Sequence, residues 1–123
     1  MFAAYGRIDL GLDPFPYSGG ITTCDASWMG VPVVTCPGDT FAGRLSLSHL
    51  TNAGLTETIA RDLHDYVEQA VALAQDLPRL AALRAGIRPR MASSPLCDAD
   101  RFVRNLFEAL RAAWREWCTA LPS

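Results

Sequence analysis

Two glycines and two threonines precede a carboxylate in the run Ser18-Gly19-Gly20-Ile21-Thr22-Thr23-Cys24-Asp25. The glycines permit a turn with positive φ, and Thr22 or Thr23 can cap the first turn of a helix. A turn that leads into a helix N-terminus gathers unpaired amides and the positive end of the helix dipole, which together attract an anion such as a diphosphate. Asp25, near the first turn, can accept hydrogen bonds from the ribose hydroxyls of the same ligand. The plain structural alternative is that this pattern only turns the chain and caps a helix.

Other polar residues that could do chemistry have simpler structural explanations. Arg44 can reach a phosphate or a sugar, but it can equally pair with an acidic side chain at the surface. Asp98 and Asp100 form an Asp-x-Asp pair of the kind that binds metal in some enzymes, yet the pair stands where a helix is expected to begin and is interpreted as a cap. His49 and His64 have no partner at metal-ligand spacing. We therefore predict no metal site and no cofactor, and we assign no catalytic residue.

The overall charge narrows the class of partner. The 123-residue chain carries 11 basic and 13 acidic residues, a formal net charge of −2. This balance provides no positive field for a phosphate backbone, so we expect no nucleic-acid partner. All of the basic residues are arginines, which excludes lysine Schiff-base chemistry and a phosphate-binding lysine from this chain.

The cysteines and the hydropathy pattern indicate the compartment. The four cysteines form no CxxC pair and are expected to be reduced and mostly buried. No apolar run approaches the length that spans a bilayer, and no signal-peptide pattern opens the sequence. We therefore predict a cytoplasmic protein that has no membrane partner.

Two strands are expected in residues 1–60. The first covers Ile8 to Leu12, where apolar and polar residues alternate, and it ends at Asp13-Pro14. The second is the short β-branched run from Val31 to Thr35. A run of this kind is typical of a strand that is buried on both faces of a parallel sheet.

Two short helices are expected to follow these strands. One begins at Thr22 or Thr23 and is closed by Gly30, and the other spans about Phe41 to Asn52 and is stopped by Gly54. The repeated strand and helix units predict an α/β fold with a short parallel sheet.

Residues 61–123 are predicted to form three or four helices. The region is rich in alanine and carries nine arginines against eight acidic residues. One apolar stripe passes through Tyr66 and Leu73, and a second is interrupted by Pro89. The last helix opens at Asp98 and places Phe102, Leu106, Leu110, Ala113 and Trp117 on one face. No linker or repeat separates the two regions, so residues 1–123 are expected to form a single unit.

A longer run of residues resembles a known family. The stretch Asp13-Pro14-Phe15-Pro16-Tyr17-Ser18-Gly19-Gly20-Ile21-Thr22-Thr23-Cys24-Asp25-Ala26-Ser27-Trp28-Met29-Gly30-Val31-Pro32-Val33-Val34-Thr35 closely resembles the O-linked N-acetylglucosamine transferase family. The similarity continues through Pro37-Gly38-Asp39 with Arg44, Gly54-Leu55, Tyr66, Ala70 and Ser94-Pro95-Leu96 to the last helix with Trp114 and Trp117. It covers nearly the whole chain and is greatest toward the bacterial members, many of which carry tetratricopeptide repeats.

The resemblance implies a fold and an activity. The fold would be part of the Rossmann-like C-terminal lobe of a GT-B glycosyltransferase, which holds UDP-N-acetylglucosamine in a cleft between two lobes. By motif position, Gly20, Ile21, Thr22 and Thr23 would line the diphosphate, and Asp25 would bind the ribose. In the inverting, metal-independent reaction, UDP leaves as a Ser or Thr hydroxyl of an acceptor protein attacks, and helix-end dipoles stabilise the charge on the leaving phosphate.

The sequence departs from the family pattern at three points. Many relatives have a polar residue where Ile21 stands, animal members have His where Gly20 stands, and the family uses a lysine that this chain does not contain. The chain also has no acceptor-binding lobe, so we expect a C-terminal fragment that is inactive alone. The alternatives are a non-catalytic module that docks through its last helix and an inactive truncated gene product. Because a short parallel sheet exposes an apolar edge and face, self-association or low stability is also predicted.

Overall fold

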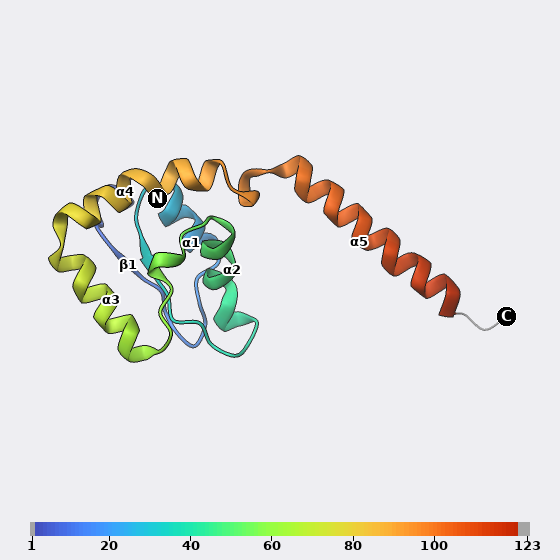
Figure 1. Ribbon diagram of the computed structural model, residues 1–123, viewed down its shortest axis with the longest axis horizontal. Coiled ribbons are helices and arrows are strands. Elements are labelled where there is room, and N and C mark those ends of the chain that lie inside the picture. Colours follow the sequence, from blue (N-terminus) through green and yellow to red (C-terminus); the bar gives the residue numbers. More distant parts are fainter. Residues whose placement is uncertain (1, 121–123) are drawn as a thin grey trace.

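A computed structural model of the protein describes residues 2–120 (Figure 1). At its centre, β1 (Gly11–Leu12) and β2 (Val33–Val34) pair in parallel, with Gly11 opposite Val33. A parallel bridge between Thr35 and Ile59 extends the sheet beyond β2. The expected short parallel sheet is confirmed, although both strands are shorter than the sequence pattern predicted.

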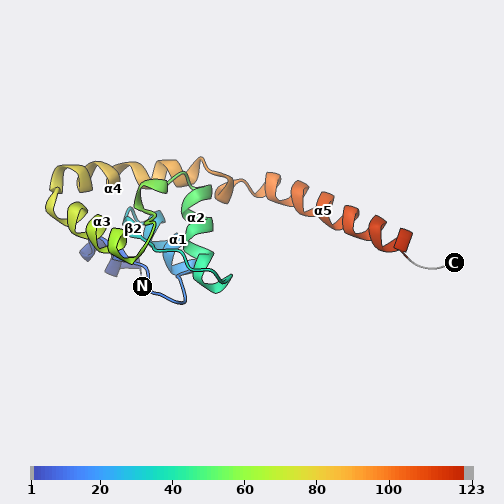
Figure 2. The ribbon, with the colours of Figure 1, turned by 60° about the horizontal axis from the view of Figure 1, so that its bottom comes forward.

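Helices make up most of the described chain and surround the two strands. In chain order they are η1 (Phe2–Arg7), α1 (Ile21–Trp28), η2 (Ala42–Arg44), α2 (Leu45–Asn52), η3 (Thr56–Thr58), α3 (Leu63–Gln75), α4 (Leu77–Ala92), η4 (Pro95–Cys97) and α5 (Ala99–Ala120). Figure 1 and Figure 2 show α1 and α2 on one side of the strands, α3 on the other, and α4 running along both groups. The structure is therefore an α/β arrangement with a large helical share.

Alternating side chains of β2 build the core on both sides of the sheet. Val33 packs in a cluster with Ala26 of α1, whereas Val34 packs with Tyr66 and Leu73 of α3. Successive residues of a strand point to opposite faces, so a run of valines covered on both faces needs a helix on each. The prediction of a strand buried on both faces is confirmed, since Val33 and Val34 are both buried.

The helix boundaries confirm some expectations and correct others. Gly30 and Gly54 have φ of 74° and 68°, the left-handed conformation in which glycine commonly ends a helix. The prediction that Pro89 interrupts the second apolar stripe is wrong, because α4 runs through it to Ala92 and buries both Ile87 and Met91. Pro89 lies in the last turn of α4 and has no amide to donate within the helix, but its own carbonyl still accepts from the amide of Ser93 at 3.2 Å.

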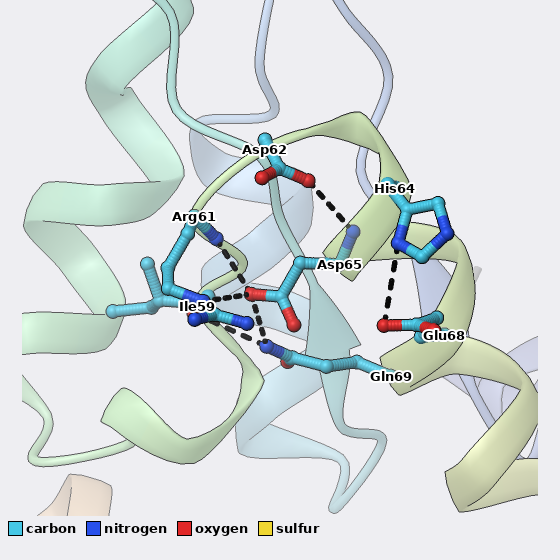
Figure 3. A network of polar contacts seen from close by, with 7 residues as sticks. All are labelled: Ile59, Arg61, Asp62, His64, Asp65, Glu68 and Gln69. Carbon is cyan, nitrogen blue, oxygen red and sulfur yellow. Dashed lines mark hydrogen bonds and ion pairs between the residues drawn. The ribbon is translucent and has the colours of Figure 1, made fainter.

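A polar network fixes the start of α3 and, through it, the loop after β1. The carboxylate of Asp62 caps α3 by accepting from the amide of Asp65 at 2.8 Å (Figure 3). One turn further into the helix lies Tyr66, whose hydroxyl donates to the carbonyl of Asp13 at 3.0 Å. The N-terminal turn of α3 thereby anchors the backbone at the carboxyl end of β1.

Candidate functional site

The N-terminus of α1 opens at the carboxyl end of β1. Gly20 is the N-cap residue, and no side chain caps the helix. The amides of Thr23 and Cys24 already bond to the carbonyl of Gly20. Within residues 2–120, the amides of Gly20, Ile21 and Thr22 meet no protein acceptor. These three amides and the positive end of the helix dipole are the groups that bind anions at helix N-termini.

The two threonines play different parts, and neither is the predicted cap. Thr23 is 3% exposed, and its Oγ1 lies 2.8 Å from Oγ of Ser46 on α2, so its hydroxyl is occupied by packing between helices. Thr22 is exposed and, with Tyr5 and Pro14, lines an open hollow of about 160 Å³. Of the two hydroxyls, that of Thr22 is therefore the one a ligand can reach.

Asp13 fixes the loop that leads into α1. Its side chain is buried, and Oδ1 accepts from the amide of Gly19 at 2.7 Å while Oδ2 accepts from the hydroxyl of Thr35 at 2.6 Å. The carboxylate thus ties the loop before α1 to the end of β2. From the sequence, Asp13 was interpreted only as the end of a strand, and this role was not predicted. The available signal was an acid directly after a strand with a glycine turn nearby.

Gly19 is needed for space and not for positive φ, which corrects the sequence-based expectation. In the described chain, only Gly30 and Gly54 have positive φ. A Cβ added at Gly19 would lie 2.5 Å from Oγ1 of Thr23 and 3.0 Å from Oδ1 of Asp13. Contacts this short require the neighbours to move. The missing side chain allows the loop to pass directly over the start of α1.

At the N-terminus of the neighbouring helix α2, the first two amides already donate hydrogen bonds to the side chain of Ser18. Its Oγ accepts from the amides of Leu45 and Ser46 at 3.0 and 3.3 Å. The hydroxyl of Ser46 in turn donates to the carbonyl of Gly19 at 2.8 Å. Of these two adjacent helix N-termini, the one that belongs to α1 is therefore the one that leaves amides open to a ligand.

Asp25 and Arg44 lie away from the hollow beside Thr22. Asp25 is half-buried on α1, one turn beyond Ile21, and does not line the hollow. The Nη1 atom of Arg44 donates to the carbonyl of Gly38 at 3.1 Å. The structure thus brings Gly20, Ile21, Thr22 and Thr23 together at one helix start, and it places Arg44 on η2 by a separate open hollow that Phe41 and His49 also line.

The remaining candidates have structural partners. Asp98 caps α5 by accepting from the amide of Arg101 at 2.9 Å, which confirms its interpretation as a cap. His64 faces Glu68 one turn along α3 at 3.3 Å (Figure 3). Within residues 2–120, no group of three or more His, Cys, Asp or Glu side chains is arranged to hold a metal ion.

The cysteines correct one expectation. All four are free, but Cys97 and Cys118 are exposed, whereas Cys24 and Cys36 are half-buried. Burial raises the pKa of both the Cys24 and Cys36 thiols, which lowers their reactivity as nucleophiles. No helix in the described part of the chain combines the length and apolar character that a membrane crossing requires.

The fold and the open helix N-terminus together define a class of protein. A short parallel sheet covered by helices, with an open helix N-terminus at the carboxyl end of a strand, is an α/β arrangement suited to bind an anionic ligand. A family model described as glycosyl transferase family 41 matches residues 5–106. The chain therefore belongs to glycosyl transferase family 41.

Individual relatives agree with this membership. The chain is 44% identical over 115 residues to the probable UDP-N-acetylglucosamine–peptide N-acetylglucosaminyltransferase SPINDLY of Solanum lycopersicum. It is 32% identical over 114 residues to the UDP-N-acetylglucosamine–peptide N-acetylglucosaminyltransferase of Caenorhabditis elegans. These matches cover 94% and 93% of this chain but only 12% and 10% of the relatives.

A solved structure extends the comparison to the fold. A mutant of the Thermobaculum terrenum O-GlcNAc transferase matches with a TM-score of 0.88 and 42% sequence identity, covering 96% of this chain and 23% of that one. The chain thus corresponds to a minor part of its relatives' length and has the fold of the matching part of an O-GlcNAc transferase.

Proposed function

We propose that this chain forms the sugar-nucleotide side of the catalytic cleft in a UDP-N-acetylglucosamine-dependent protein O-linked N-acetylglucosamine transferase. In this proposal, residues 1–123 are one unit within the Rossmann-like C-terminal lobe of a GT-B enzyme. Residues 1–60 bind the nucleotide, and residues 61–123 supply the helices that support it. The names of the relatives indicate the donor class, and the open amides at the start of α1 are the observation in this chain that carries the proposal.

The diphosphate is placed at the N-terminus of α1. The free amides of Gly20, Ile21 and Thr22 can donate to phosphate oxygens, and the hydroxyl of Thr22 adds a side-chain donor from the wall of the hollow. An anion at a helix N-terminus is stabilised by about 0.3–1 kcal/mol through the dipole at an exposed position. Backbone donors also explain how the site tolerates Ile21, because its contribution is the amide and not the side chain.

Asp25 is assigned to the ribose. It lies one turn beyond the amides on the same helix, and its half-buried carboxylate can accept two hydrogen bonds from vicinal hydroxyls. Asp25 stands three residues after Thr22 on α1, and residues at this spacing are neighbours on the helix surface. Arg44 is also proposed to contact the ligand. To do so, its guanidinium would have to release the carbonyl of Gly38 and donate to a phosphate or sugar oxygen instead.

The proposed chemistry is stabilisation of a leaving group. When the hydroxyl of an acceptor Ser or Thr attacks the anomeric carbon, the bond to UDP breaks and negative charge grows on the diphosphate. Amides that already point to this charge need no reorganisation during the reaction. No residue of this chain is assigned to activate the acceptor, so the acceptor protein and its binding groups belong to another part of the enzyme, and the chain alone is expected to be inactive.

The remaining expectations stay proposals. We propose a cytoplasmic location, no nucleic-acid or membrane partner, an inverting reaction that uses no metal or cofactor, and an origin among the bacterial members of the family. The curated relatives described above come from a plant and a nematode, and the solved structure is that of the Thermobaculum terrenum enzyme.

Calorimetric titration of the chain with UDP, UMP and uridine tests the proposal. We expect UDP to bind with a Kd of about 1 mM, which corresponds to about −4 kcal/mol, and uridine to bind more weakly because it brings no phosphate to the amides. Asp25→Asn should weaken UDP binding by about fivefold to tenfold through loss of a charged acceptor. Asp100→Asn, on the remote helix α5, is the matched control and should leave it unchanged. Equal binding of UDP and uridine would contradict the placement of the diphosphate.

A further inference from the structure

Two consecutive glycines precede α1 at the candidate anion site. Glycine has more backbone freedom than any other residue, so the peptide group between Gly19 and Gly20 can turn over unless other groups hold it. Backbone amides stabilise a developing charge best when they are oriented in advance. A site built from these amides therefore needs side chains that hold the peptide groups on both sides of Gly19. Asp13 holds one of them, because its carboxylate accepts from the amide of Gly19.

Ser46, in the first turn of α2, holds the peptide group on the other side of Gly19. Helices α1 and α2 lie side by side (Figure 1), and Oγ of Ser46 donates to the carbonyl of Gly19 at 2.8 Å. The side chain of Ser46 is fully buried, so its hydroxyl must find its partners within the protein. Asp13 and Ser46 thus fix the backbone of Gly19 from two segments that are distant in the sequence.

The hydrogen bond from Ser46 determines where the amide of Gly20 points. The peptide bond between Gly19 and Gly20 is trans, and the C=O and N–H groups of a planar trans peptide point in opposite directions. Because the carbonyl of Gly19 is directed to Ser46 on α2, the amide of Gly20 is directed away from α2. This amide is the first of the three that meet no protein acceptor within residues 2–120.

The same hydrogen bond assigns the proton between Ser46 and Thr23. A hydroxyl group has one proton and two lone pairs. Since a carbonyl can only accept, the proton of Ser46 is used on Gly19, and Thr23 is the donor in its 2.8 Å contact with Oγ of Ser46. The protons are therefore ordered from Thr23 to Ser46 to the carbonyl of Gly19. The hydroxyl of Thr23 has no proton left for a phosphate oxygen.

We infer that Ser46 and Thr23 are positioning residues of the diphosphate site. Their hydroxyls do not touch the ligand. They hold the carbonyl of Gly19 so that the amide of Gly20 is already turned toward a phosphate oxygen before UDP binds. This inference rests on the proposed function, which supplies the ligand. It gives Thr23 an indirect part, in place of the direct contact with the diphosphate that the family resemblance implies.

The first test needs no ligand. Residual dipolar couplings report the direction of each N–H bond, and they are compared between the isotope-labelled chain and Ser46→Ala. We expect the coupling of Gly20 to change, while that of Ala26, further along α1, still fits the parent structure. Ser94→Ala removes another buried hydroxyl, which donates to the carbonyl of Met91 at 2.6 Å, and should leave the coupling of Gly20 unchanged. An unchanged coupling in Ser46→Ala would overturn the inference, whatever UDP does.

Titration with UDP connects this orientation to binding. Ser46→Ala should weaken UDP binding by about threefold to tenfold. UDP should also shift the amide of Gly20 much less than in the parent chain, whereas the shift at Thr22 persists. Ser94→Ala should change the affinity by less than about twofold, because the site lies far from it in the sequence and shares no partner with it. Equal UDP binding by the parent chain and Ser46→Ala would refute the inference alone. A parent chain in which UDP moves no amide at the start of α1 would refute the proposed function and the inference together.

A pair of variants at Thr23 covers the case in which Ser46→Ala does not fold. Thr23→Val keeps the size of the side chain and removes the donor, whereas Thr23→Ser removes a methyl group and keeps the donor. Packing alone would make Thr23→Ser the more harmful change. The positioning role predicts instead that Thr23→Val turns the N–H of Gly20 and weakens UDP binding by about twofold to fivefold, and that Thr23→Ser restores both. UDP binding that is equal in the two variants, or weaker in Thr23→Ser, would contradict the inference.

Discussion

The carboxylate of Asp13 accepts a hydrogen bond of 2.7 Å from the amide of Gly19 across the loop that joins β1 to α1. The second oxygen of the same carboxylate accepts a hydrogen bond from the hydroxyl of Thr35. The two hydrogen bonds together fix the start of α1 relative to the end of β2. The free amides of Ile21 and Thr22 follow within three residues. The geometry of the candidate anion site therefore depends on a buried acid that a ligand does not touch.

Replacement of Asp13 should destabilise the fold strongly. Asp13→Asn removes the charge from two hydrogen bonds. Its Oδ1 can still accept from the amide of Gly19, but its amide nitrogen would have to donate to the hydroxyl of Thr35, whose own proton then loses its acceptor. Hydrogen bonds to charged groups contribute about 1.5–3 kcal/mol each, and a buried unpaired donor adds to the loss. We expect the free energy of unfolding in urea to fall by about 2–4 kcal/mol. Asp39→Asn, at an exposed position, is the control, and an equal effect of the two changes would contradict the assigned role.

Two glycine-to-alanine changes are predicted to have opposite signs. Gly19→Ala forces a Cβ to within 2.5 Å of Oγ1 of Thr23 and should destabilise the chain by about 1–3 kcal/mol, as overpacking does. Gly86→Ala adds the same methyl group inside α4, where no atom apart from the adjacent residues and the helix's own backbone lies within 4 Å, and should stabilise it by about 0.5–1 kcal/mol. Thermal unfolding of both variants checks this. A destabilised Gly86→Ala or a neutral Gly19→Ala would show that the loop is not packed as described.

The network at the start of α3 predicts a dependence on acid pH. Oδ2 of Asp65 accepts from the amide and Nε of Arg61 at 2.8 and 3.0 Å and from the Nε2 of Gln69 at 3.2 Å (Figure 3). The hydrogen bonds from Arg61, above all, lower the pKa of Asp65 from 3.8 to about 2. Since the folded pKa lies below the unfolded one, the ionised carboxylate stabilises the fold above pH 4, and this contribution is lost as the pH falls from about 4 to about 2.

Asp65→Asn should therefore lower stability at neutral pH and flatten the loss of stability between pH 4 and pH 2. Urea unfolding at a series of pH values measures both effects. Asp39→Asn removes one carboxylate without this network and serves as the control. If Asp65→Asn retains the full acid-induced loss, the hydrogen bonds of Figure 3 do not contribute to stability.

The isolated chain is predicted to self-associate. One edge of β1 has no neighbouring strand in the described sheet, and the apolar half of α5 is bare. Sedimentation at increasing concentration should show species larger than a monomer, and Leu110→Arg should shift them toward the monomer. A parent chain that stays monomeric at every concentration would contradict this prediction.

The sequence predicted the parts of the fold that local chemistry determines. The β-branched residues around Val33 and Val34 indicated a strand covered on both faces, and Gly30 and Gly54 marked helix ends, because each signal lies within a few neighbouring residues. The helix that begins at Ile21 was also predicted, with its start placed slightly later, at Thr22 or Thr23. These features follow from propensity and patterning alone.

The sequence did not predict features that depend on contacts between distant segments. Thr23 was expected to cap α1, but its hydroxyl pairs with Ser46, 23 residues away, so a tertiary contact outcompeted a local one. The role of Asp13 was not predicted for the same reason, because its partner Thr35 lies 22 residues away in the sequence. The candidate site residues were predicted from the resemblance and the local turn chemistry, whereas the groups that hold them in place required the three-dimensional structure.

The most direct test of the proposed function is an amide-resolved NMR titration of the isotope-labelled chain with UDP. We expect the largest shifts at the amides of Gly20, Ile21 and Thr22, and we expect Thr22→Val to weaken binding while Thr51→Val on α2 does not. The contradicting result is a titration in which these amides stay unmoved, or one in which the shifts gather instead around the larger hollow beside Leu77 and Arg84.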